Sequence, residues 1–186
     1  MKSKIELNVT VDDEQWTENT DFDAVKVAEE LRDLAFAYVA DACEHELLAL
    51  DKTYEVNVCL SNDAEVQRLN KEFRGKDKPT NVLSFACIDD DEFWDMLDKS
   101  ADMELGDIIL AFETLQREAD EKRITVYAHY CHLLVHGFLH ILGFDHQTDE
   151  EADEMESNNH SEHTPPTMTL FSFLTSGDGH PHFMQC

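Results

Sequence analysis

Three histidines near the end of one apolar segment have the spacing of metal ligands. His136 and His140 are four residues apart, and His146 follows six residues later. On a helix, residues four apart differ by about 40° around the axis and about 6 Å along it, so both imidazoles can reach one ion. Gly143 can end that helix in the left-handed conformation and turn the chain, so that His146 reaches the same ion. Three imidazoles plus an open position are typical of a catalytic zinc site.

The residue after the first of these histidines separates this pattern from a peptidase. The spacing His-x3-His-x2-Gly-x2-His is the one that metzincin peptidases use, but those enzymes carry a glutamate base where this chain has Gly137. His132 extends the same helical stripe, but it lies about 12 Å along a helix from His140 and is expected to support the ligands or pack against them. The alternative that these are core or surface histidines of an apolar helix stays open.

A second group of chemically active residues is basic. Five of the chain's 14 basic residues fall within 11 positions, namely Arg68, Lys71, Arg74, Lys76 and Lys78. A planar guanidinium beside a metal can hold a phosphodiester at two oxygens and stabilise the charge that develops on them. The lysines can equally form a solvated helix face and loop.

Composition limits the classes of function. The length of 186 residues suits one domain, and 41 acidic against 14 basic residues give a formal charge of -27. That charge repels phosphate backbones at long range, so a DNA-coating protein is excluded and no DNA partner is expected. No apolar stretch is long enough to cross a membrane, and no apolar run follows the first lysines, so we expect no membrane association and a cytoplasmic location. The five cysteines form no CxxC pair, so neither disulfides nor cysteine-bound zinc are expected.

Hydropathy patterns predict alternating strands and helices. Strands are expected at 5–11 and 54–60, where apolar residues alternate with polar ones, and at the apolar segments 82–86 and 105–112. Helices are expected where they recur every three or four residues, at 23–50, 62–73, 113–122 and 125–142. The acidic segment 89–104 is interpreted as a solvated excursion. This order predicts an α+β fold in a single domain, with a mixed β-sheet of about four strands and the three-histidine metal site at a helix end.

The composition changes after Glu156. Residues 157–186 contain no Lys or Arg and three of the four prolines. We therefore expect a folded domain at 1–156 and a polar, flexible C-terminal tail at 157–186.

Three blocks of sequence resemble one family. The string HGFLHILGFDH at 136–146 resembles the signature of the YbeY family, and residues 69–85 (LNKEFRGKDKPTNVLSF) and 105–108 (LGDI) resemble its other blocks. With the order of elements, the resemblance covers about residues 5–156. It implies a zinc-dependent single-strand endoribonuclease of rRNA maturation, including 3' end processing of 16S-type rRNA, and of ribosome quality control. The implied partners are rRNA and the ribosome or a ribosomal protein.

The resemblance also implies roles for particular residues. His136, His140 and His146 would hold one Zn2+, and Arg74 matches the family's functionally important arginine. Substrate binding is expected of three basic residues in and after this block, namely Arg74, Lys76 and Lys78. Asp145 is a candidate catalytic residue that would orient a ligand or accept a proton, although it can equally cap the turn after Gly143.

Asp107 is a weaker candidate for the same orienting role.

Two other functions remain open at this point. One is a non-enzymatic ribosome-associated factor, whose zinc is structural and whose acidic surface binds a basic ribosomal protein. It predicts a fourth protein ligand, whereas an enzyme predicts an open position. The other is a metallohydrolase of another substrate class, such as a peptidase, against which Gly137 argues. Other transition metals also suit three histidines.

Overall fold

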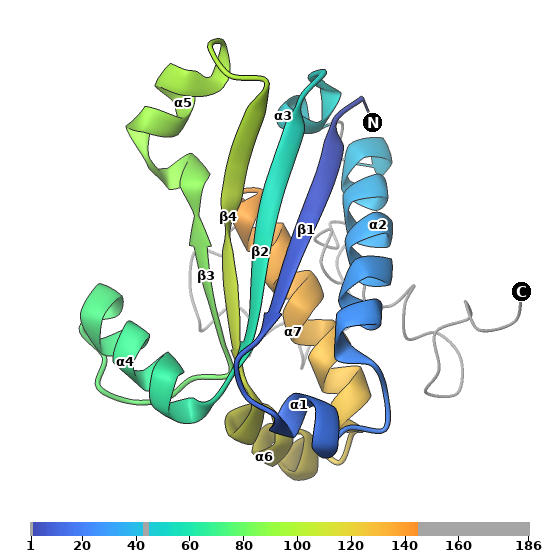
Figure 1. The fold of residues 1–186 in the computed structure, drawn as a ribbon, viewed down its shortest axis with the longest axis vertical. Helices are drawn as coiled ribbons and strands as arrows, with labels where there is room; N and C mark the ends of the chain where they lie inside the picture. The colour runs from blue at the N-terminus through green and yellow to red at the C-terminus, as the bar shows by residue number, and fades with distance from the viewer. Residues whose placement is uncertain (1, 43–44, 145–186) are drawn as a thin grey trace, which may run out of the picture.

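A four-stranded sheet organises the chain in the computed structural model, which describes residues 2–42 and 45–144. The strands lie in the order β1 (Lys4–Val11), β2 (Thr53–Ser61), β4 (Asp102–Ala111) and β3 (Val82–Ala86). β1, β2 and β4 run parallel to one another, and β3 pairs with β4 in the antiparallel sense (Figure 1). The predicted α+β class and mixed sheet of four strands are confirmed.

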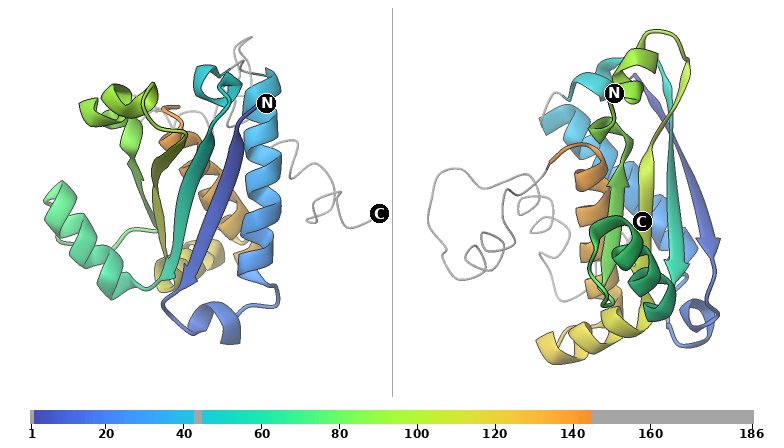
Figure 2. Two further views of the ribbon diagram at one scale, coloured as in Figure 1. Left: turned by 45° about the horizontal axis from the view of Figure 1, so that its top comes forward. Right: turned by 90° about the vertical axis from the view of Figure 1, so that its left-hand side faces the viewer.

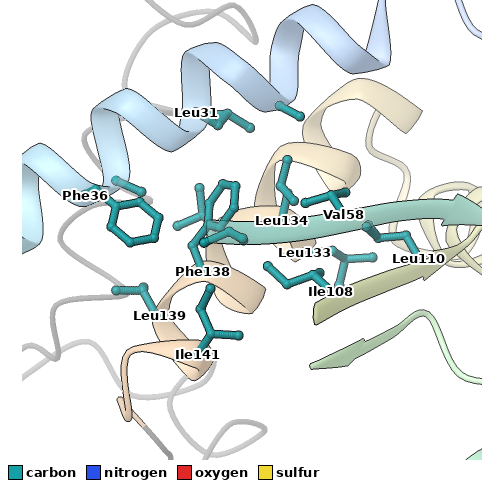
Figure 3. Packing of buried hydrophobic residues seen from close by; sticks show 14 of the residues in the cluster. Leu31, Phe36, Val58, Ile108, Leu110, Leu133, Leu134, Phe138, Leu139 and Ile141 are labelled. Carbon is teal, nitrogen blue, oxygen red and sulfur yellow. The ribbon is translucent and has the colours of Figure 1, made fainter. Parts of the chain in front are cut away.

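Two helices, α2 (Ala24–Ala42) and α7 (Val126–Ile141), cover one face of this sheet (Figure 2). Because side chains alternate along a strand, Val58, Ile108 and Leu110 point to this face and are buried. Figure 3 shows them packed against α7, where Phe138 meets Phe36 of α2 in a T-shaped contact with ring centroids 5.6 Å apart. This dry layer is the main core and holds α7 in place.

The opposite face is covered only in part. Helix α4 (Asp63–Arg74) packs over β3 and β4 through a small separate cluster of Val66, Leu83, Ile109 and Ala111. Asn62 caps the start of this helix, since its Oδ1 accepts from the backbone N–H of Glu65 at 3.0 Å. The rest of this outer face carries the polar side chains of β1, β2 and β4.

The predicted helix at 23–50 is wrong beyond Ala42. The chain forms α2 and then a separate short helix, α3 (Glu46–Ala49), preceded by the extended residue His45 with ψ 124°. The reason is geometric: the 19 residues of α2 span about 28 Å, close to the length of the nine-residue strand β2. A longer helix would carry the chain past the end of the sheet, where it must reverse to run parallel to β1.

The acidic segment is more ordered than predicted. Residues 89–104 were expected to be a solvated excursion, but they include α5 (Asp91–Leu97) and the start of β4, after the short helix η1 (Cys87–Asp89). Asp90 caps α5 by accepting from the backbone N–H of Glu92 at 2.9 Å, and Phe93 is buried. One apolar ring and one cap outweigh the acidic composition that suggested a loop.

The two remaining helices lie at the end of the sheet opposite α3 and α5 (Figure 1). They are α1 (Gln15–Glu18) and α6 (Phe112–Lys122), the second of which leads into α7. Among the helices of the described ranges, none has the length and apolar character needed to cross a membrane.

Candidate metal and phosphate site

Helix α7 brings two of the predicted metal ligands together. The helix begins after Thr125, whose hydroxyl oxygen accepts from the backbone N–H of Ala128 at 3.1 Å. One turn separates His136 from His140, and their Nε2 atoms lie 2.9 Å apart with the rings at 76°. Both rings are half-buried. The sequence spacing thus produces the expected convergence of two imidazoles.

This pair fits a metal of the size of zinc. Two nitrogens bound tetrahedrally at the usual Zn–N length of 2.0–2.1 Å lie about 3.3 Å apart. The observed separation of 2.9 Å is within a few tenths of an ångström of that value, so a small rotation of either ring suffices. Neutral imidazole nitrogens are also common ligands of zinc and neighbouring transition metals.

The end of α7 has the predicted turn. Gly143 has φ +82°, in the left-handed region, and the N–H of Phe144 donates to Leu139 O at 3.1 Å. The third predicted ligand, His146, and the candidate Asp145 lie outside the described residues, as does the predicted domain boundary at 156. Within 2–42 and 45–144, no three His, Cys, Asp or Glu side chains form a metal-binding group.

Gly137 occupies a place where no glutamate can fit. A Cβ atom built on Gly137 of α7 would lie 2.8 Å from Ile108 Cγ2 of β4. The side of the helix that carries Gly137 therefore faces the dry core. A carboxylate at this position would be buried without solvent, so the glutamate base of a metzincin has no counterpart in this fold.

Further histidines continue along α7 away from the pair. The rings of His129, His132 and His136 follow one another with centroids 6.3 and 6.4 Å apart. Burial lowers the pKa of His132 to about 4, so this ring is neutral at pH 7. The predicted supporting or packing role of His132 agrees with its place between the pair and His129.

His129 begins a junction that sequence reasoning missed. This residue is only 1% exposed, and its Nε2 lies 2.8 Å from Glu118 Oε2. Burial lowers the pKa of His129, and the hydrogen bond to Glu118 opposes that shift. The same carboxylate oxygen accepts from Asn81 Nδ2 at 2.8 Å. Glu118 therefore joins α7 to the residue that precedes β3, and no local pattern in the sequence signals this contact.

Arg74 ends α4 beside the edge strand. Its Nη2 donates to Ser84 O of β3 at 3.4 Å. Side chains of β3 alternate, so Val82 and Ala86 pack on the α7 side while Leu83 packs on the α4 side. Strand β3 is the edge of the sheet, so this contact places the guanidinium of Arg74 at that edge.

The basic residues divide into two groups. Arg68 forms ion pairs with Glu65 and Glu72, and Lys71 pairs with Asp77. No carboxylate within residues 2–42 and 45–144 forms an ion pair with the other three basic residues, namely Arg74, Lys76 and Lys78. These three are the basic residues that the sequence assigned to substrate binding.

A buried amide, missed from the sequence, shapes the loop that carries the two lysines. Gly75 adopts φ +69° and ends α4. Asn70, within the helix, donates from its side-chain Nδ2 to Lys78 O at 2.8 Å. Its backbone carbonyl oxygen accepts from the backbone N–H of Lys76 at 3.2 Å. The backbone beside both lysines is therefore fixed by one residue.

Asp107 lies on the other face of the sheet. Its neighbour Ile108 points into the core against α7, so Asp107 points outward, where it accepts from Asn57 Nδ2 at 2.9 Å. Strand alternation thus places Asp107 away from the histidine pair.

Comparison with known proteins gives one consistent family. A family model described as Endoribonuclease YbeY matches residues 6–163. Proteins named Endoribonuclease YbeY include one from Paramagnetospirillum magneticum, 51% identical over 107 residues that cover 58% of this chain and 64% of the relative. Another, from Allorhizobium ampelinum, is 38% identical over 153 residues, covering 82% of this chain and 86% of the relative. The matched part is therefore less than two thirds of the first relative's length.

A solved structure is also similar. The solution structure of TM1509 from Thermotoga maritima has a TM-score of 0.47 and 22% sequence identity, covering 91% of this chain and 87% of the other. The family assignment rests on the sequence matches, which include the histidine pair and the basic block in one continuous span. The chain belongs to the Endoribonuclease YbeY family.

Proposed function

We propose that this chain is a zinc-dependent endoribonuclease that cleaves single-stranded rRNA. One observation carries the proposal: two imidazole nitrogens converge at 2.9 Å on α7, in a chain of the YbeY family. His136, His140 and His146 would hold the metal. When bound, zinc would polarise a phosphoryl oxygen and lower the pKa of a water molecule.

The chain's own basic residues would position the RNA. Arg74 presents a guanidinium with five N–H donors, and its bond to Ser84 O is long at 3.4 Å, so donors remain for a phosphodiester. Lys76 and Lys78 would hold neighbouring phosphates as point charges. The ion pairs of Arg68 and Lys71 exclude those two residues from the same role.

The proposed setting is the ribosome. A net charge of -27 weakens encounter with RNA, so a protein partner would supply the attraction. We therefore propose rRNA maturation in the cytoplasm, with 3' end processing of 16S-type rRNA and ribosome quality control as its context. A ribosomal protein is the proposed partner.

The peptidase alternative has less support. A peptidase of metzincin type needs a carboxylate base beside the first histidine, and Gly137 packs against Ile108 at that position. The described residues therefore favour a phosphodiester substrate, for which positioning and charge stabilisation supply most of the catalysis.

The first experiment compares rRNA cleavage by metal-loaded protein and by an identically purified His140→Ala variant, at several salt concentrations. We expect the variant to lose at least about 100-fold in rate, because one ligand of the metal is gone. Equal cleavage by both proteins would identify a contaminating nuclease. Zinc bound at full occupancy without any cleavage would instead favour the ribosome-associated factor with structural zinc.

A second pair of variants tests the phosphate role. Arg74→Ala is expected to lower kcat/KM about 100-fold or more, and Arg74→Lys to restore only part of it, because a lysine cannot contact two phosphate oxygens at once. Arg68→Ala is the matched control, since it removes an arginine from the same helix that is already paired with glutamates. Equal losses in Arg74→Ala and Arg68→Ala would show that the effect comes from loss of positive charge in general and not from a specific contact of Arg74.

A further inference from the structure

A groove lies on the outer face of the sheet, beside α4 and away from the histidine pair. Its volume is about 570 Å3, within the usual range of small-ligand sites. The apolar lining comes from α4 and three strands and includes Cys59, Leu69, Phe73, Phe85 and Ile109. Polar groups from β1, β2 and β4 form the other wall, namely Asn8, Thr10, Asn57 and Asp107. We refer to these lining residues as the outer groove.

Phe73 is unusually placed for a large apolar residue. It is 62% exposed at the groove, although its ring makes an edge-to-face contact with Phe85 at a centroid distance of 5.3 Å. That contact fixes one edge of the ring and leaves much of its surface open. Exposed aromatic rings of this kind serve as stacking platforms for the bases of single-stranded nucleic acids.

The groove lies next to Arg74, the residue that we propose binds phosphate. Phe73 and Arg74 are consecutive on α4, and their partners Phe85 and Ser84 are consecutive on β3. A phosphate held by Arg74 therefore has the open ring of Phe73 beside it. An RNA strand gripped at Arg74 would place a neighbouring base at the outer groove.

The charge on the polar wall selects the base over the phosphate. Asn57 Nδ2 donates to Asp107 Oδ1 at 2.9 Å, and both residues line the groove, while Glu104, which does not line it, accepts from the same nitrogen at 2.7 Å. The Asp107 carboxylate repels an anionic phosphate and accepts a hydrogen bond from the amino group of adenine, cytosine or guanine. A neutral, flat ligand with N–H donors is complementary to this lining.

The geometry points to one occupant: the outer groove binds a single unpaired nucleobase of the RNA substrate, stacked on Phe73 and adjacent to the phosphate held by Arg74. This inference rests on the proposed function, and it adds a base-binding subsite to it. The subsite makes the enzyme selective for RNA whose bases are unstacked, since a paired base cannot enter.

Kinetics of the full chain loaded with zinc test the subsite. Phe73→Ala is expected to raise KM for a short single-stranded RNA roughly 5- to 150-fold, the range that loss of one stacked base gives, with kcat changed less than about twofold. Phe73→Tyr keeps the ring and should restore KM. The matched control is Trp94→Ala, which removes another exposed aromatic residue, 51% exposed on α5, and should leave KM unchanged.

An abasic scan locates the base. Nucleosides of the RNA are replaced one at a time by an abasic residue, and KM is measured with wild type and with Phe73→Ala. We expect one position at which the replacement raises KM for wild type but adds nothing for Phe73→Ala, because both changes remove the same contact. An RNA with 5-iodocytidine at that position should crosslink to Phe73 on irradiation, as located by mass spectrometry.

The outcomes separate this inference from the proposed function. Unchanged KM in Phe73→Ala, or purely additive losses in the abasic scan, would overturn the subsite while wild type still cleaves RNA. In that case the exposed ring fits an apolar side chain of a protein partner instead. Failure of wild type to cleave, or equal cleavage by His140→Ala, would overturn the proposed function and the subsite together.

Discussion

The two faces of the sheet differ in what covers them. The inner face lies under α2 and α7 and is almost entirely apolar, and the histidine pair is carried on the helix that seals it. The outer face lies under α4 only at β3 and β4, and elsewhere it presents amides and carboxylates. One sheet therefore combines a rigid support for the proposed metal ligands with an open surface at which we propose that RNA binds. Arg74 stands between them, at the edge strand β3.

This difference indicates where stability and function reside. Residues on the inner face hold α7 at a fixed distance from β4, as the contact of Gly137 with Ile108 illustrates. Residues on the outer face contact solvent, and they can change with less effect on folding. Substitutions on the two faces should therefore have opposite profiles, with losses of stability on one and losses of RNA binding on the other.

The same substitution on each face gives the largest contrast. Phe138→Ala removes a fully buried ring and should cost about 3–5 kcal/mol in free energy of unfolding. Phe73→Ala on the outer face should cost less than about 1 kcal/mol. Urea unfolding of both variants measures the difference, and comparable losses would show that the outer face also belongs to the structural core.

Gly137→Ala tests how tightly α7 packs against Ile108 of β4. Alanine favours a helix by about 1 kcal/mol over glycine, but its Cβ would lie 2.8 Å from Ile108 Cγ2. We expect a net loss of about 1–3 kcal/mol from overpacking. The double variant Gly137→Ala/Ile108→Ala should lose less than the sum of the two single variants, because the small side chains accommodate each other. A stabilised Gly137→Ala protein would contradict this packing.

Asn57→Asp places a third carboxylate beside those of Glu104 and Asp107. It removes a donor to Glu104 and Asp107 and brings like charges together, so we expect about 1 kcal/mol of destabilisation at low salt. Most of the charge contribution should vanish in high salt. Asn57→Ala, which loses the hydrogen bonds without adding charge, is the control and should show little salt dependence.

Acid should lower the free energy of unfolding through a buried histidine of the inner face, and this effect should develop gradually as the pH falls. The pKa of His129 is lowered by burial, so the unfolded chain takes up a proton at higher pH than the folded protein does. The free energy of unfolding should therefore fall as pH drops below about 6.5, the ordinary value for histidine. Chemical denaturation between pH 7.5 and 5 measures the slope. His129→Gln should make the slope shallower without abolishing it, because burial also lowers the pKa of His132. An unchanged slope would assign the acid sensitivity elsewhere.

Local patterns were sufficient for most of the elements and for the histidine pair. Alternation located β1 and β2, and a spacing of four residues placed His136 and His140 on one side of a helix. The turn at Gly143 also followed from residue type, because φ +82° favours glycine. These features depend on residues within one element, where the helical or strand period is visible in the sequence.

Contacts between distant elements could not be predicted in the same way. Glu118 joins His129 to Asn81, and each of the three comes from a different part of the chain. The end of α2 depends on the length of the strands beside it, and the groove at Phe73 depends on how α4 lies over the sheet. Such features arise from three-dimensional packing, for which a single sequence carries no period.

The position of α7 in the chain has a consequence for synthesis. It is the last helix of the described residues, and the sheet that it covers is complete once Ala111 has been added. At about 5–20 residues per second, about 1.5–6 s of translation separate the finished sheet from a finished α7. During that interval the part of the inner face that α7 will cover is exposed and needs protection from aggregation. The proposed nuclease therefore cannot assemble its metal site until nearly all of the described chain has left the ribosome that makes it.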